Sequence, residues 1–134
     1  MKTCGIDLKG SDAIVVCLEG DATRYKLIET ETKRISLTDS FDQKEVQIFQ
    51  QKIAALLSQQ GIDKVGIKER ATKGKFAGGS VSFKMEGLIQ NCNTPVSIVH
   101  LRTIKAKLKN AEIAEIKLNA YQKDAFDLAV FLLL

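Results

Sequence analysis

The sequence predicts an α/β fold in which a five-stranded mixed sheet is flanked by helices. Three strand-like segments open the chain, and alternating helix-like and strand-like segments follow, which gives the element order βββαβαβα. The stretches between the later strands are long enough for helical crossovers, so parallel pairing is expected there. Residues 1–134 are assigned to a single domain, because no linker, repeat or low-complexity tract interrupts the pattern.

The first strands are expected to form a hairpin. Apolar residues dominate 3–8 and 13–18, and the KGSD sequence at 9–12 between them is typical of a tight turn. The stretch 25–37 is rich in Thr and Ile and predicts a third strand. Its charges favour a position at a sheet edge, where they discourage pairing with another sheet.

The middle of the chain predicts two helices with a strand between them. The first helix opens with the capping-box pair Ser40 and Gln43, and strand 64–69 follows it. Ser80 is expected to cap the second helix, in which Gly87 would allow a close approach to the sheet. A basic, glycine-rich loop precedes that second helix and is expected to be mobile.

The last third of the chain predicts a strand at 95–101, short Lys-rich helices at 102–109 and 111–118, and a final helix at 120–134. The final helix is apolar on all sides towards its end, so it needs a cover on all sides. Either the sheet and a neighbouring helix supply that cover, or a second subunit does. A homodimer through this helix is therefore one of two expectations.

Cysteine usage and apolar run lengths indicate the compartment. The three cysteines, Cys4, Cys17 and Cys92, are far apart and form no CxxC pair, and His100 is the single histidine. This pattern argues against a zinc site and for a reducing environment. No apolar run reaches 18 residues, so no membrane association is expected, and a cytoplasmic protein is predicted.

The net charge of +4 is unevenly distributed. Residues 68–118 hold 10 Lys and Arg against 4 Asp and Glu, while the flanking segments are close to neutral. A local basic zone of this kind either attracts a polyanion or forms a solvated face without a partner. Both interpretations stay open at this point.

An aspartate within the first strand is the most unusual local feature. Side chains alternate along a strand, so Asp7 shares its face with Thr3 and Gly5, whose small side chains leave room beside it. An ionised carboxylate that is partly desolvated needs a metal, a cation or several donors. The alternative is an aspartate at a strand end that caps the turn through Ser11 or is solvated.

Further acids stand at two other positions suited to a site. Glu69 ends its strand directly before the glycine-rich loop, and Asp124 and Asp127 share one side of the final helix. Magnesium prefers carboxylate oxygens from more than one chain segment, and these acids would supply them together with the first-strand aspartate. The alternatives are an ion pair of Glu69 with Lys68 or Arg70, and helix acids favoured by the macrodipole.

Three motifs carry a resemblance to a known superfamily. GIDLKGSDAIVVCL, VGIKE and DAFDLAV resemble the acidic motifs of the RNase H-like nucleases, most closely those of the RuvC-type Holliday-junction resolvases. The resolvases have a first-strand Asp, a fourth-strand Glu and a D-x-x-D in the terminal helix, followed by small apolar residues. The resemblance implies an RNase H-like fold over nearly the whole chain, in a small bacterial family of the domain-of-unknown-function type.

The resemblance also implies a chemistry. Asp7, Glu69 and Asp124 match the metal-binding catalytic acids, and Asp127 matches the fourth acid. The implied activity is hydrolysis of phosphodiesters in structured or duplex nucleic acid with Mg²⁺ or Mn²⁺ as cofactor, through a two-metal arrangement.

Basic residues around the implied site predict contacts with the nucleic-acid backbone. They are Arg70, Lys73 and Lys75 on the loop and Lys105 and Lys107 in the Lys-rich segment. Contacts of this type are independent of sequence and weaken as salt rises.

Departures from the resolvase pattern support an alternative function. The resolvases have an aromatic residue soon after the second acid, whereas here Phe76 is the nearest aromatic and a poor substitute. Lys9 is placed to neutralise Asp7 without a metal. The alternative is a non-catalytic nucleic-acid-binding or oligomeric assembly module that keeps the fold. A phosphate-binding hairpin of the sugar-kinase and actin-like type ranks last, because those proteins need two such lobes.

Overall fold

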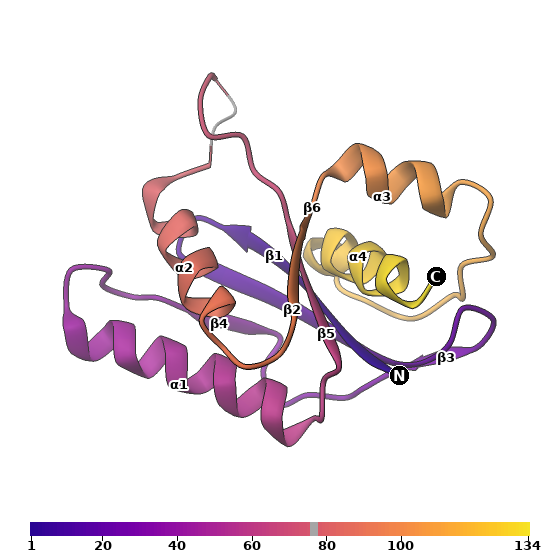
Figure 1. Cartoon of the computed structure of the whole chain (residues 1–134), viewed down its shortest axis with the longest axis horizontal. Coiled ribbons are helices and arrows are strands. Elements are labelled where there is room, and N and C mark those ends of the chain that lie inside the picture. The colour runs from indigo at the N-terminus through magenta and orange to yellow at the C-terminus, as the bar shows by residue number, and fades with distance from the viewer. Residues whose placement is uncertain (76–77) are drawn as a thin grey trace.

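The computed structural model describes residues 1–75 and 78–134, and Figure 1 shows its arrangement. Phe76, the aromatic compared with that of the resolvases, lies outside these ranges. In chain order the elements are β1 (Lys2–Lys9), β2 (Asp12–Gly20), β3 (Tyr25–Leu27), β4 (Arg34–Ser36), α1 (Gln43–Gln59), β5 (Lys64–Lys68), α2 (Ser80–Gln90), β6 (Val96–Val99), α3 (Leu101–Leu108), a 3₁₀ turn (Ala120–Gln122) and α4 (Lys123–Leu133).

The strands form one mixed sheet in the order β3-β2-β1-β5-β6, and β4 also pairs with β2. β3 and β4 therefore share the outer position of a five-position sheet. β2 pairs antiparallel with β1, β3 and β4, whereas β5 pairs parallel with β1 and with β6. The predicted mixed five-stranded sheet with flanking helices is confirmed.

The third strand predicted over 25–37 is two short strands. β3 pairs with the end of β2 at Leu18 to Gly20, and β4 pairs with its start at Asp12 to Ile14. Between them, residues 28–33 are not part of a strand, and a hydrogen bond from Thr30 Oγ1 to the Thr32 carbonyl closes a local turn there. The edge is thus interrupted in its charged middle.

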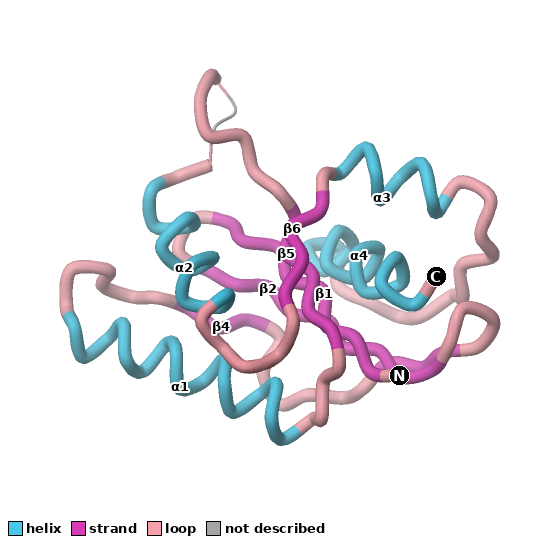
Figure 2. Tube along the Cα trace, viewed as in Figure 1, coloured by secondary structure: helices cyan, strands magenta, loops and turns pink. Residues whose placement is uncertain are grey.

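Helices cover both faces of the sheet (Figure 2), with α1 and α2 on one face and α3 and α4 on the other. The alternation predicted for β1 is observed. Ile6 belongs to the apolar cluster shared with Phe49 of α1 and Met85 of α2, whereas Thr3 bonds to α4. A second cluster packs β2 against α4.

Both central helices begin differently from the prediction. Asp42, not Ser40, caps α1, because its side chain accepts a hydrogen bond from the Lys44 N–H at 3.0 Å. Gly79 is the cap residue of α2, which begins at Ser80. A Cβ at Gly87 would have no neighbour within 4 Å among the described atoms, so the close approach predicted there does not occur.

The predicted helix at 111–118 is an irregular, extended segment. Ile116 and Leu118 pack against the second cluster, and the Ala114 N–H donates to the Tyr25 hydroxyl at 2.9 Å. An extended chain covers about 3.3 Å per residue against 1.5 Å in a helix, so this form lets few residues return from α3 to the start of α4. Leu101, predicted in a strand, instead opens α3.

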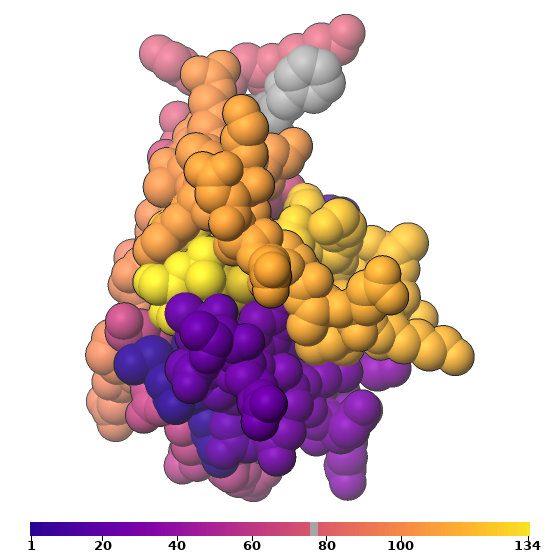
Figure 3. Space-filling model, turned by 90° about the vertical axis from the view of Figure 1, so that its right-hand side faces the viewer, coloured from indigo at the N-terminus to yellow at the C-terminus, as the bar shows by residue number. Residues whose placement is uncertain are grey.

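The final helix is buried within its own chain. Ala125, Leu128 and Ala129 have no exposed surface, because β1, β2, β5 and α3 surround α4. Figure 3 shows its last turn in yellow between the orange segment of α3 and the purple segment of the first strands. Of the two covers predicted, the sheet and a neighbouring helix supply it, so burial of this helix does not require a second subunit. In the part of the chain described, no helix is long and apolar enough to cross a bilayer.

Candidate functional site

The candidate site lies at the carboxyl ends of β1 and β5. The two strands are parallel and in register, with Gly5 opposite Gly66 and Ile6 opposite Ile67. One step further on, Asp7 and Lys68 continue this register at the strand ends. Paired residues of neighbouring strands point to the same face, so both side chains extend toward the α4 side of the sheet. Ligands commonly bind at this edge of an open α/β sheet.

Small residues let the first turns of α4 lie directly on β1. A Cβ at Gly5 would be only 1.9 Å from the Ala125 carbonyl oxygen, so only glycine fits there. The Thr3 hydroxyl donates to the Ala129 carbonyl at 2.9 Å and fixes the helix along the strand. Asp124, at the start of α4, is thereby held near the ends of β1 and β5.

Asp7 is buried, with 2% of its surface exposed. Its Oδ2 atom accepts no hydrogen bond from any described residue, and the nearest cation is the Lys9 Nζ at 3.4 Å. The Lys9 side chain is 55% exposed, so its ammonium lies at the boundary with solvent. A buried carboxylate with a single ion pair and no hydrogen bond is poorly compensated for its lost hydration.

Asp124 has a closer cation. The Lys68 Nζ lies 2.6 Å from its Oδ2, and both side chains are partly buried. Burial by itself would raise the pKa of Asp124, but the hydrogen bond from Lys68 and the charges of Lys68, Lys9 and Lys105 outweigh burial and lower the pKa. The carboxylate is therefore held in its charged form by several lysines at once.

These residues form what we call the strand-end cluster: Asp7, Lys9, Lys68, Lys105 and Asp124. It contains three ammonium groups and two carboxylates, so it carries an excess positive charge. Cations that act on one carboxylate from β1, β5 and α3 produce a locally positive site at the strand ends.

The other two predicted acids lie apart from the cluster. Glu69 follows the last residue of β5, is exposed, and makes no side-chain hydrogen bond or ion pair within the described ranges. Asp127 pairs instead with Lys123 one helical turn before it, at 3.1 Å. The structure thus brings together Asp7 and Asp124 but neither Glu69 nor Asp127.

Arg70, predicted to contact phosphate, is a buried anchor. Its guanidinium bonds to Ser82, to the Lys68 carbonyl and to Glu86, and it stacks over Phe83 at 4.6 Å. Only 9% of the side chain is exposed. These contacts tie the end of β5 to α2 at the base of the glycine-rich loop.

The four lysines predicted to bind nucleic acid have different surroundings. Lys73 and Lys75 are exposed on the loop, and Lys105 is exposed on α3 while its charge acts on Asp124. Lys107 donates to the carbonyl of Leu134, at the far end of α4. Since α4 rises about 1.5 Å per residue, that end is roughly 15 Å from the cluster.

The described residues do not form a two-metal site. Across 1–75 and 78–134, no group of three or more His, Cys, Asp or Glu side chains is arranged to hold a metal ion. The unbonded Oδ2 of Asp7 is a plausible metal ligand, but an ammonium contacts each of the two carboxylates. Lysine nitrogen is charged and offers no lone pair, so it competes with a cation.

Lys68 is the functional residue that the motif comparison missed. That comparison assigned Glu69 because it is the acid in VGIKE, but strand alternation places Lys68 on the face of Gly66 and puts Val65 and Ile67 on the other. Asp7 shares its face with Gly5, which pairs with Gly66. The period of two along both strands was therefore a signal for Lys68.

Comparison with solved structures identifies the fold. The model aligns with the structure "Thermus thermophilus RuvC" at a TM-score of 0.75 and 15% identity, covering 98% of this chain and 92% of that chain. "T. thermophilus RuvC in complex with Holliday junction substrate" gives 0.68 and 14%, covering 98% and 91%. The fowlpox virus resolvase in complex with substrate Holliday junction DNA gives 0.52 and 18%, covering 99% and 93%. At these identities the likeness shows the fold, and the predicted RuvC-like fold is confirmed.

Comparison of sequences identifies the family. No curated protein matches the chain. The family model described as "Protein of unknown function (DUF3010)" matches residues 1–132. The chain therefore belongs to the DUF3010 family, whose member described here has a RuvC-like fold.

Proposed function

We propose that this protein is a nucleic-acid-binding module that keeps the RuvC-like fold and binds backbone phosphates through lysines at the strand ends. The observation that carries the proposal is the 2.6 Å contact between Lys68 and Asp124. A lysine from β5 occupies the place beside the α4 acid where a metal-dependent nuclease would need another carboxylate.

The charges of the strand-end cluster suit this function. Asp7 and Asp124 hold the ammonium groups of Lys9 and Lys68, and the excess of one positive charge remains available for a phosphate. A preset ammonium loses less side-chain freedom on binding than a solvated one. Contacts of this type bind without reading sequence and weaken with salt.

The surroundings of the cluster offer further contacts. In Figure 1 the glycine-rich loop rises on one side of the strand ends and α3 lies on the other. Exposed Lys73 and Lys75 are on the loop, and Lys105 is on α3. A nucleic-acid backbone that crosses the strand ends would meet lysines on both sides. The T. thermophilus and fowlpox proteins hold Holliday junctions, so a branched duplex is our first choice of ligand.

Metal-dependent cleavage is a second candidate function, favoured by the buried, unbonded Oδ2 of Asp7. It requires Mg²⁺ or Mn²⁺ to displace ammonium groups from Asp7 and Asp124. It also requires a third acid, Glu69 or Asp127, to turn toward them. Structured or duplex nucleic acid would be the substrate in that case.

Binding and cleavage assays on the same ligands separate the two candidates. We expect a labelled four-way junction, a duplex and an RNA–DNA hybrid to bind at low salt and to stay intact with Mg²⁺ or Mn²⁺. Lys68→Ala and Lys105→Ala should weaken binding. Lys64→Ala, at the opposite end of β5, is the matched control and should leave it unchanged.

Cleavage by the native protein that is lost in Asp7→Asn and Asp124→Asn variants would replace the binding proposal with the nuclease. Absence of binding to all three ligands at low salt would overturn both candidates.

A further inference from the structure

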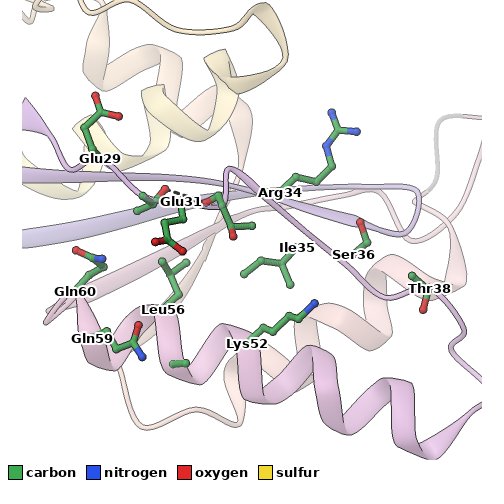
Figure 4. A pocket seen from close by; sticks show the side chains of 13 residues that line it. Glu29, Glu31, Arg34, Ile35, Ser36, Thr38, Lys52, Leu56, Gln59 and Gln60 are labelled. Atoms are coloured by element: carbon green, nitrogen blue, oxygen red, sulfur yellow. Dashed lines mark hydrogen bonds between the residues drawn. The ribbon is translucent and has the colours of Figure 1, made fainter.

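A groove lies along the outer edge of the sheet, on the α1 face and away from the strand-end cluster (Figure 4). Its volume is about 730 Å³. We call it the edge groove. The residues that matter for its chemistry are Glu29, Glu31, Ile35, Ser36, Lys52 and Leu56.

One wall of the edge groove is an open strand edge. The Lys33 carbonyl accepts from the Val15 N–H at 3.0 Å, and the Leu37 N–H donates to the Ser11 carbonyl at 2.8 Å. Peptide groups alternate in direction along an antiparallel strand, so those of Arg34 and Ser36 point away from β2. Within the described sheet, β4 has no neighbour on that side. Its outward N–H and C=O groups can pair with an added strand.

The floor of the edge groove is apolar. Ile35 is buried beneath the strand and Leu56 is half-buried on α1. In Figure 4 the side chains of Ile35 and Leu56 extend into the space between the strand and the helix. An apolar side chain of an added strand would be covered there.

The charges of the edge groove are separated along its length. Glu29 and Glu31 lie at the end that precedes β4, and Lys52 lies below Ile35 and Ser36 (Figure 4). All three are exposed, and none has a salt bridge with a residue that the structure describes. The groove therefore matches a ligand that is negative at one end and positive at the other.

We infer that the edge groove binds an extended peptide segment of a partner protein, which adds to the sheet as a strand antiparallel to β4. Main-chain hydrogen bonds to Arg34 and Ser36 supply affinity, and alternate side chains supply specificity. Because β4 runs from the glutamate end to the Lys52 end, an antiparallel segment carries its acidic residue before its basic one. An apolar residue between them covers Leu56.

A second copy of this chain fits the edge groove less well. β4 carries Arg34 and no acidic residue, so a copy that pairs through β4 would leave the Lys52 charge unmatched. The free charges of the groove therefore favour a different protein with an acid-first segment.

Two labelled heptapeptides test the inference. TDVIVKT has the predicted order of charges, and TKVIVDT reverses it. We expect TDVIVKT to bind more tightly by about fivefold, the equivalent of roughly 1 kcal/mol for exposed charge pairs. Lys52→Glu should weaken TDVIVKT binding by a similar factor. Lys44→Glu, which makes the same charge change on α1 outside the groove, should not.

The double variant Lys52→Glu with Glu31→Lys provides a positive test, because it should reverse the order of preference. Equal affinity for the two peptides, or no binding of either, would overturn the inference.

Hydrogen exchange locates the bound peptide. On binding, the amides of Arg34 and Ser36 should exchange more slowly, while that of Ile35, which already faces β2, should not change. Protection elsewhere would contradict the inference. So would dimerisation in sedimentation experiments that competes with the peptide, since it would assign the groove to a second copy.

Discussion

At the scale of single residues, the fold depends on how closely α4 approaches β1. The positions of glycine show where this happens. A side chain at Gly5 would overlap the α4 backbone, whereas one at Gly87 would meet nothing. The helix thus approaches the sheet on the α4 face, at the strand that carries Asp7.

Gly5→Ala and Gly87→Ala are a matched pair of variants. Gly5→Ala should lower the free energy of unfolding by at least 1–3 kcal/mol, the usual cost of roughly one extra methyl in a packed interior. Gly87→Ala should raise it by about 0.5–1 kcal/mol, because alanine loses less entropy than glycine in a helix. Urea unfolding measures both. Equal effects of the two substitutions would show that α4 does not lie on β1 as described.

The lowered pKa of Asp124 gives a second prediction at this scale. A carboxyl group with a folded pKa below its unfolded value stabilises the protein above the unfolded pKa of about 4. That contribution is lost as the pH falls through the folded pKa. In Lys68→Met, burial remains but the hydrogen bond and its charge are gone, so the pKa of Asp124 should rise and the acid-range pH dependence should weaken.

NMR titration of the Asp124 side-chain carboxyl carbon measures that pKa in both proteins. Lys64→Met serves as the control for loss of one positive charge elsewhere on β5. An Asp124 pKa that is the same in the native protein and in Lys68→Met would contradict the Lys68 contact.

At the scale of elements, strand alternation decides the chemistry of the site. Asp7 and Lys68 share one face because their strands are parallel and in register. Glu69 lies one residue further on and does not join them. A shift of one residue along β5 therefore separates a carboxylate site from a lysine site.

Lys68→Glu tests that account by adding a carboxylate beside Asp7 and Asp124. We expect this variant to bind Mn²⁺ more tightly than the native protein, because acids from three elements would then converge. Isothermal titration calorimetry with MnCl₂ measures the affinity, and Lys64→Glu is the control for the change in charge. Native affinity equal to that of Lys68→Glu would favour the nuclease candidate instead.

Much of the fold was predictable because its elements have clear local patterns. The hairpin, the apolar stripe of α1 and the positions of β5 and α2 follow from periodicity and turn residues. The interrupted edge at 28–33 and the extended segment at 111–118 were not predictable. Both depend on contacts with distant segments, such as the bond from Ala114 to Tyr25.

The candidate site was predictable in part. Asp7 stood out as a charged residue in an apolar strand, and Asp124 as an acid on an inward-facing helix side. Arg70 was misjudged as a solvent-exposed cation, since its partners Ser82 and Glu86 come from a different element. Composition alone gives no indication that a loop arginine will be buried.

At the scale of the whole molecule, one fold presents two separate surfaces. The strand-end cluster lies on the α4 side, between the glycine-rich loop and α3 (Figure 1), and the edge groove lies on the α1 side. A protein with both surfaces would hold a nucleic acid and a partner peptide at once. Lys68→Ala should therefore leave peptide affinity unchanged while it weakens nucleic-acid binding.

The salt dependence of binding to a four-way junction is the most direct test of the central claim, that Lys68 contacts a phosphate where a nuclease would bind metal. Anisotropy titrations between 50 and 200 mM salt give the slope of log K against log salt, and removal of one phosphate contact reduces that slope by about 0.9. The account predicts this reduction for Lys68→Ala and none for Lys64→Ala. An unchanged slope in Lys68→Ala would contradict it.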